Sequence, residues 1–131
     1  TWNEARRAIA VQYAHALANT TLLLPPEDVS GKMIYHLYVI RSTQREALKA
    51  ALKQRNIGCE VHYPIPDYLQ PACADLGYRR GLLPVTEKAC AEVLSIPCFA
   101  ELAVDEMERV TQAIVESLDE IAGRAPQVVY K

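Results

Sequence analysis

Residues 57–66 read Ile-Gly-Cys-Glu-Val-His-Tyr-Pro-Ile-Pro, and this stretch decides how the chain is organised. Cys59, Val61 and Tyr63 alternate with two polar residues, which is the period of a strand with two unlike faces. Two prolines follow, and because proline has no N–H for a sheet ladder, the strand must end there. We therefore predict a strand at 59–62, followed by a stiff, extended loop at the end of a sheet. A loop of this kind is well suited to holding a ligand.

The rest of the pattern predicts two further strands and several helices. Residues 34–41 are rich in β-branched and aromatic side chains and favour a central strand, and residues 94–96 form a short apolar run that Pro97 stops. The helical period predicts amphipathic helices at 3–17, 43–55, 70–76, 85–93 and 103–121. Thr43 with Glu46 has the spacing of a capping box, and Gly123 is placed to cap the last helix.

These elements predict an α/β (or α+β) fold, in which a small, mostly antiparallel sheet of about three strands packs against helices. Residues 1–123 form one domain, and 124–131 form a tail with a short strand expected at 128–129. His36, inside the predicted central strand, is expected to lie in the core or in an interface.

Composition excludes several classes of protein. Half of the 131 residues are hydrophobic, 23% are charged and the formal net charge is −2, so the chain is globular and has no basic excess for nucleic acid. No apolar run approaches the roughly 18 residues of a membrane span. The four cysteines form no Cys-x-x-Cys pair and have no histidine at metal-ligand spacing. We interpret them as small buried residues in a reducing cytoplasm and expect no metal site.

An ordered set of short motifs carries a family resemblance. His62-Tyr63-Pro64-x-Pro66 is followed by Leu-Gln-Pro-Ala at 69–72, Leu-Gly-Tyr at 76–78, Leu-Pro-Val-x-Glu at 83–87 and Leu-Ser-Ile-Pro at 94–97. With the run at 35–41, this set resembles the C-terminal part of the DegT/DnrJ/StrS-type sugar-nucleotide aminotransferases. These are pyridoxal-phosphate enzymes of the aspartate-aminotransferase fold (fold-type I). The resemblance extends from about Trp2 to about Val115.

The resemblance implies that residues 1–123 are the C-terminal small domain of a larger enzyme and that 1–19 are the helix linking it to a missing large domain. The chain starts at Thr1 without an initiator Met, as a piece of a longer protein would. The family is typically homodimeric, so the expected partners are the large domain, a second subunit and a sugar-nucleotide substrate, with no nucleic acid and no membrane. The complete enzyme would move an amino group from a glutamate-like donor to a keto-sugar nucleotide.

The catalytic lysine of the family belongs to the upstream domain. This chain has five lysines, and none lies in the family's lysine motif; they are Lys32, Lys49, Lys53, Lys88 and Lys131. A Schiff-base lysine and phosphate-binding donors are what pyridoxal phosphate requires of a protein. We therefore expect no catalytic and no cofactor-binding residue here, and an inactive chain when it is alone.

The resemblance also implies four substrate-binding candidates in the loop. His62 would donate to a sugar hydroxyl or phosphate or act as an acid or base, although a strand-end histidine bonded to backbone is the alternative. Tyr63 is expected to pack under the loop. Gln70 would bind ligand or cap the next short helix. Tyr68 stands where many relatives have a histidine, and because tyrosine does not titrate near pH 7, this difference points to a different sugar.

A second hypothesis comes from another class of protein. Strand–helix–strand domains of this size also bind small molecules or dimerise without catalysis. The chain would then be a free-standing binding or regulatory module. An exposed apolar face on the first helix would favour the domain of a larger enzyme over this alternative.

Overall fold

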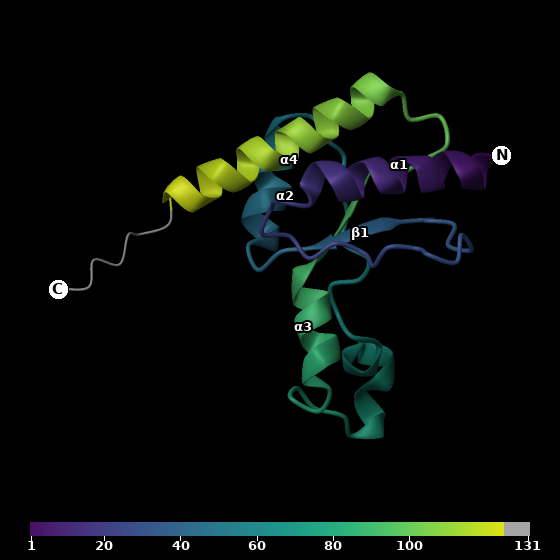
Figure 1. Cartoon of the computed structure of the whole chain (residues 1–131). Helices are drawn as coiled ribbons and strands as arrows, with labels where there is room; N and C mark the ends of the chain where they lie inside the picture. Colours follow the sequence, from purple (N-terminus) through teal and green to yellow (C-terminus); the bar gives the residue numbers. More distant parts are fainter. Residues whose placement is uncertain (125–131) are drawn as a thin grey trace.

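A computed structural model describes residues 1–124 of the chain. Three long helices form its body: α1 (Trp2–Leu17), α2 (Arg45–Gln54) and α4 (Val104–Arg124). Helix α4 packs against both α1 and α2. The sheet has two strands, β1 (Tyr38–Arg41) and β2 (Val93–Ile96). The helices lie together beside this sheet, and the N-terminus and the end of α4 belong to this half of the molecule (Figure 1).

The two strands pair antiparallel, with Tyr38 opposite Ile96 and Ile40 opposite Leu94. Because side chains alternate along a strand, these four residues share one face, and all four are buried. They join the apolar faces of the helices in one core, whose fully buried aliphatic residues are Leu17, Ile40, Leu48, Leu52, Leu94 and Ile114. The expected fold class is therefore confirmed: helices packed on a small antiparallel sheet.

Two predicted strands are shorter than the sequence pattern suggested. Residues 34–37 do not join β1, because Tyr35 has a φ of 43° and takes the chain out of the extended region. His36 is exposed just before the strand, so its predicted core position is wrong. The predicted strand at 59–62 is reduced to a single bridge between Glu60 and Ser95, and Leu23 forms a similar bridge with Arg41 at the opposite edge.

The helix ends also correct two predictions. Helix α2 begins at Arg45, and Ser42 rather than Thr43 supports its start: the Ser42 hydroxyl accepts from the Gln44 N–H at 3.1 Å. Gly123 does not end α4, which continues to Arg124. By contrast, Thr1 and Glu4 do form a capping box on α1. The strand expected at 128–129 lies outside the described residues.

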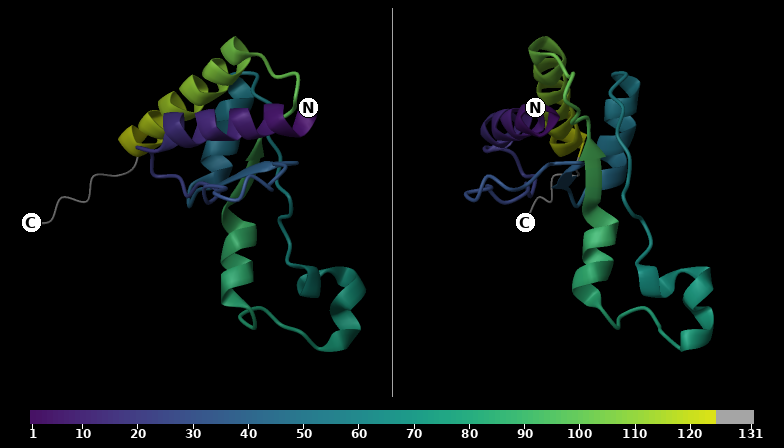
Figure 2. Two further views of the ribbon diagram at one scale, coloured as in Figure 1. Left: turned by 45° about the vertical axis from the view of Figure 1, so that its right-hand side comes forward. Right: turned by 90° about the vertical axis from the view of Figure 1, so that its right-hand side faces the viewer.

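A projecting arm lies between α2 and β2 in the sequence. We define the arm as residues 67–92, which contain the 3-10 helices η1 (Asp67–Leu69) and η2 (Pro71–Leu76) and the helix α3 (Pro84–Glu92). Figure 2 shows the arm extending away from the helical body, with η1 and η2 set apart from α3 and connected to it by a loop at the far end. None of these three described elements contains a buried residue. The arm therefore depends on a few specific contacts rather than on a core of its own.

Candidate functional site

His62 lies at the end of the extended segment that runs beside β2. Its Nδ1 is 3.0 Å from the Oγ of Ser95, a β2 residue that is only 5% exposed. The backbones of Glu60 and Ser95 exchange two hydrogen bonds of 2.7 and 3.1 Å, which fixes the register of this segment on the strand. His62 is two residues beyond Glu60, so its side chain points to the same sheet face as that of Ser95. The structure thus places His62 at a defined position on the sheet.

His62 and Ser95 line a shallow cleft of about 310 Å³. Its walls come from the residues before β1, from segment 58–62 and from the end of β2, and include His36, Cys59 and Cys98. Burial raises the pKa of both thiols, which favours their protonated form. All four cysteines are free and half-buried, so the prediction that they are buried is only partly right. The other side chains of the cleft that can form hydrogen bonds are those of His36, Glu60, His62 and Ser95.

Glu60 closes one side of the cleft and is paired with α2. Its Oε2 lies 3.0 Å from the Nζ of Lys49. The hydrogen bond and the positive charge of Lys49 hold the pKa of the Glu60 carboxyl below its usual range. The carboxylate is therefore charged and occupied by an ion pair at neutral pH.

Tyr63 does not pack under the loop as predicted. It is 68% exposed, and its ring stands edge-on to the His62 ring at 5.5 Å. The peptide bond that joins the two residues is cis. Tyr63 thus presents a large aromatic surface to solvent next to the cleft, without itself lining it.

Tyr68 lies in the arm and has partners there. Its hydroxyl donates to Oε1 of Glu87 on α3, and its ring contacts Tyr78 edge-on at 5.9 Å. The same Oε1 accepts the N–H of Gly81 at 2.6 Å. The Tyr68 hydroxyl holds the pKa of Glu87 below its usual range, while burial and the adjacent carboxylate raise the pKa of Tyr68. The structure therefore joins Tyr68 to α3 and does not bring it to the cleft of His62.

Gln70 does not cap η2 as one of its two predicted roles required, while its other predicted role, binding ligand, stays a prediction. It precedes η2 without a side-chain cap, and its Nε2 donates to the carbonyl of Ile65 at 3.4 Å. Of the four predicted site residues, His62 alone lines the cleft, Tyr63 flanks it, and Tyr68 and Gln70 belong to the arm and its entry. Ser95 was missed by the sequence analysis, although a single hydroxyl in an apolar strand was a usable signal.

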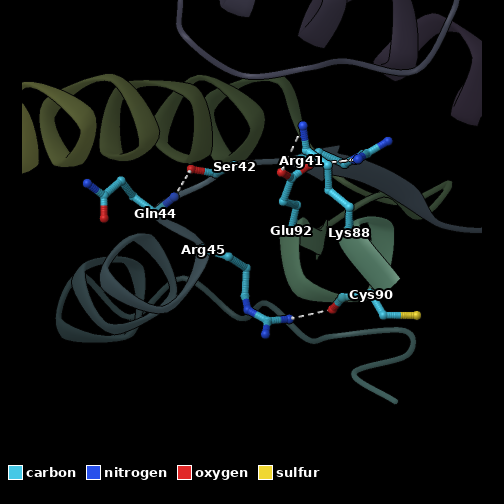
Figure 3. A network of polar contacts seen from close by, with 7 residues as sticks. All are labelled: Arg41, Ser42, Gln44, Arg45, Lys88, Cys90 and Glu92. Atoms are coloured by element: carbon cyan, nitrogen blue, oxygen red, sulfur yellow. Dashed lines mark hydrogen bonds and ion pairs between the residues drawn. The ribbon is translucent and has the colours of Figure 1, made fainter. Parts of the chain in front are cut away.

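An ionic network fixes the arm to the sheet (Figure 3). Oε2 of Glu92, at the end of α3, lies 2.7 Å and 3.1 Å from two guanidinium nitrogens of Arg41 on β1. Lys88 approaches the other Glu92 oxygen at 3.8 Å. Arg45 of α2 donates to the carbonyl of Cys90 at 3.4 Å. These contacts connect the base of α3 to both β1 and α2.

The lysines of the described residues do not fit a pyridoxal-phosphate site. Lys49 and Lys88 pair with carboxylates, and Lys32 and Lys53 are exposed. No lysine of residues 1–124 lines the cleft at His62 or the larger hollow beside α1. This larger hollow, of about 570 Å³ between α1 and segment 24–28, contains none of the predicted site residues either.

Two features are absent from residues 1–124. They contain no cluster of three or more histidine, cysteine, aspartate or glutamate side chains arranged for a metal ion. Among them, no helix is both long and apolar enough to cross a bilayer.

Comparison with known proteins gives consistent matches. A model of the DegT/DnrJ/EryC1/StrS aminotransferase family matches residues 1–115. A protein of Geobacillus stearothermophilus named pleiotropic regulatory protein is 41% identical over 118 residues, which are 88% of this chain and 32% of that protein. A dTDP-3-amino-3,6-dideoxy-alpha-D-galactopyranose transaminase of Aneurinibacillus thermoaerophilus is 33% identical, over 86% of this chain and 30% of the enzyme.

Solved structures agree with the sequence matches. The crystal structure of S. venezuelae DesV in complex with a ketimine intermediate superposes with a TM-score of 0.83 and 34% identity, covering 88% of this chain and 31% of DesV. An aminotransferase of Brucella abortus gives a TM-score of 0.81 at 28% identity, covering 89% of this chain and 31% of that protein. The chain thus spans about a third of the length of the relatives that it matches.

Proposed function

Because the chain belongs to the DegT/DnrJ/EryC1/StrS aminotransferase family, we propose that it acts as one domain of a longer pyridoxal-phosphate enzyme. The family resemblance predicted from the motifs is thereby confirmed. The longer enzyme would transfer an amino group from a glutamate-like donor to a keto-sugar nucleotide. The observation that carries this proposal is the family match over residues 1–115, in relatives about three times as long as this chain.

In this proposal, residues 1–123 are the small C-terminal domain, and α1 links it to a large domain that holds the cofactor. The positions of the lysines support this division, since the described ones are exposed or paired with carboxylates. The lysine that anchors pyridoxal phosphate would come from the large domain. A second subunit would complete a homodimer.

The small domain would help to close the substrate cleft through the segment around His62. The imidazole lines a cleft, has one nitrogen held by Ser95 and carries Tyr63 at its edge. These groups suit a sugar nucleotide, because an imidazole donates to hydroxyl or phosphate oxygens and an exposed aromatic ring stacks on planar groups. Tyr68 and Gln70 would act indirectly, by shaping the arm that borders this region.

One observation favours a second candidate function. The relative with 41% identity is named a pleiotropic regulatory protein. If that name describes a non-catalytic role, a regulatory module that binds a small molecule is the alternative for this chain.

A titration with pyridoxal phosphate separates the two candidates. We would compare this chain with the complete product of its gene, follow the cofactor by absorbance, trap it with borohydride and locate the modified lysine by mass spectrometry. Trapping and transamination in the longer protein alone support the proposal. Trapping at one lysine of this chain would contradict the assignment of the cofactor lysine to the large domain. If neither protein traps the cofactor, the regulatory alternative replaces the transaminase.

A further inference from the structure

We infer that Ser95 is a positioning residue for His62: its buried hydroxyl donates to Nδ1, so that the neutral imidazole carries its proton on Nε2 and presents an N–H donor to the cleft. The inference deepens the proposed function, on which its consequence for substrate binding rests. The tautomer itself does not depend on that function and can be measured on this chain.

The first step is the geometry of the pair. Ser95 Oγ and His62 Nδ1 are 3.0 Å apart, within hydrogen-bond distance, and Ser95 is 5% exposed. The paired backbones of Glu60 and Ser95 set the register. Since a slip by one residue would send His62 to the opposite face of the sheet, the contact is built into the strand pairing.

The second step decides which atom is the donor. A buried hydroxyl needs an acceptor for its proton, and leaving it without one is costly. In the described part of the chain, the Ser95 hydroxyl has one hydrogen-bond partner, His62 Nδ1. In a neutral imidazole one nitrogen accepts and the other donates. The Ser95 proton therefore selects Nδ1 as the acceptor and places the ring proton on Nε2.

The third step concerns where Nε2 lies. Three buried side-chain polar atoms of residues 1–124 lack a hydrogen-bond partner: Arg6 Nε, Tyr38 Oη and Arg45 Nε, the last of which is ion-paired with Glu46. His62 Nε2 has no hydrogen bond within this part of the chain and is not among them, so it is not buried. His62 lines the cleft, and Nε2 is thus its solvent-reaching polar atom. A donor at this point fits an acceptor oxygen, such as a sugar hydroxyl or a phosphate oxygen.

Nitrogen NMR of the complete 131-residue chain tests the tautomer directly. With the histidines labelled with ¹⁵N and the pH held about two units above the ordinary histidine pKa of about 6.5, long-range ¹H–¹⁵N correlations distinguish protonated from unprotonated ring nitrogens. We expect Nε2–H for His62 in the wild-type chain. A proton found on Nδ1 of the wild-type ring overturns the inference without any variant.

Two variants then test whether Ser95 is the cause. Ser95→Ala should lose the single-tautomer pattern at His62, while Ser95→Thr, which keeps the hydroxyl, should restore it. His15 is exposed, lies on α1 away from the cleft, and serves as an internal control that neither variant should alter. An unchanged His62 pattern in a folded Ser95→Ala chain would show that Ser95 does not select the tautomer.

The consequence for binding is measured separately in the longer active protein. If Ser95 acts through His62, Ser95→Ala should raise the KM for the sugar nucleotide by roughly 5-fold, as expected for one hydrogen bond. The same change should have no further effect in a His62→Ala background. If the effects of Ser95→Ala and His62→Ala on KM are additive in the double variant, Ser95 does not act through His62. If the NMR shows the Nε2–H tautomer but the KM is unchanged in every variant, the hydrogen bond between Ser95 and His62 stands. The role of His62 in binding the substrate is then refuted.

Discussion

The rings of Tyr13 on α1 and Tyr38 on β1 lie 5.1 Å apart in the core, yet their hydroxyl groups are in opposite situations. Tyr13 donates to the carbonyl of Pro97 at 2.7 Å. The Tyr38 hydroxyl is buried, and residues 1–124 offer it no hydrogen-bond partner. Two neighbouring residues of the same type therefore allow the free energy of one buried hydrogen bond to be compared with that of one unpaired hydroxyl.

Removing the two hydroxyls should affect the free energy of unfolding differently. Tyr13→Phe deletes a buried hydrogen bond and leaves the Pro97 carbonyl without it, so the free energy of unfolding should fall by about 1–2 kcal/mol. Tyr38→Phe removes a group that had no partner, and stability should stay within about 0.5 kcal/mol or rise. Urea unfolding of the two variants beside the wild type measures both. Equal losses in the two variants would contradict the assignment.

The same core should make the protein sensitive to alkali. Burial raises the pKa of Tyr38 to about 12, and it also raises the pKa of Tyr13. In the unfolded chain tyrosine ionises near pH 10, so above that pH the unfolded state gains a charge that the folded state resists. Stability is therefore fully present below pH 10 and declines as the pH rises to about 12.

For Tyr38 alone this decline should reach about 2 kcal/mol. Urea midpoints recorded through this pH range should fall more steeply for the wild type than for Tyr38→Phe. An identical slope in the two proteins would mean that Tyr38 ionises as easily in the folded core as in water.

The strands show what the sequence could and could not predict. Residues 34–41 have high β-propensity throughout, but propensity measures how well a side chain fits a paired, half-buried surface. Strand β2 has four residues and pairs with 38–41 one by one, so the neighbouring positions 34–37 have no partner in β2. The turn at Tyr35 then lies outside the sheet. A local sequence pattern cannot predict the length of a partner strand that lies far away in the sequence.

For the helices and the site too, local features were predicted from the sequence and long-range contacts were not. The apolar period of α4 correctly predicted that Met107, Val110 and Ile114 are buried, because this signal is local. The start of α2 was missed because the Ser42 N–H also bonds to Glu92 on the far side of the arm. Likewise, the strand pattern placed His62 at the end of a strand, whereas its partner Ser95 is a long-range contact. Contacts of this kind require the fold.

The Arg41–Glu92 pair should make a measurable contribution to stability. Both side chains are mostly buried, with exposures of 27% and 13%, and one carboxylate oxygen accepts from two guanidinium nitrogens. Removing the charge leaves Arg41 desolvated without its partner, so Glu92→Gln should lower the free energy of unfolding by about 1–3 kcal/mol. Thermal and urea unfolding provide the measurement.

Lys88 is the matched control in the same network. It is 69% exposed and 3.8 Å from Glu92, and exposed pairs of this kind contribute little. Lys88→Ala should therefore change stability by less than about 0.5 kcal/mol. A larger loss for Lys88→Ala than for Glu92→Gln would place the stabilising charge on the solvent side of the network.

The last prediction concerns Glu87, which joins the two ends of the arm. Its Oε1 accepts from the Tyr68 hydroxyl and from the Gly81 N–H, and the arm elements have no buried residue to replace these bonds. Glu87→Ala should speed amide hydrogen exchange across 67–83 and leave the core helices unchanged, because opening follows local contacts. Asp75→Ala, on the exposed surface of η2, is the control and should leave exchange unaltered.

Acid should imitate the Glu87 substitution. The pKa of Glu87 is lowered in the folded arm by the Tyr68 hydroxyl, so the carboxylate contacts are present above the ordinary carboxyl pKa and are lost as the pH falls through the lowered value. Arm protection in the wild type, corrected for the intrinsic exchange rate, should then fall toward that of Glu87→Ala at low pH. Protection that is the same in both proteins at every pH would mean that the apolar contacts of Tyr68 with Tyr78, and not the carboxylate, hold the arm closed.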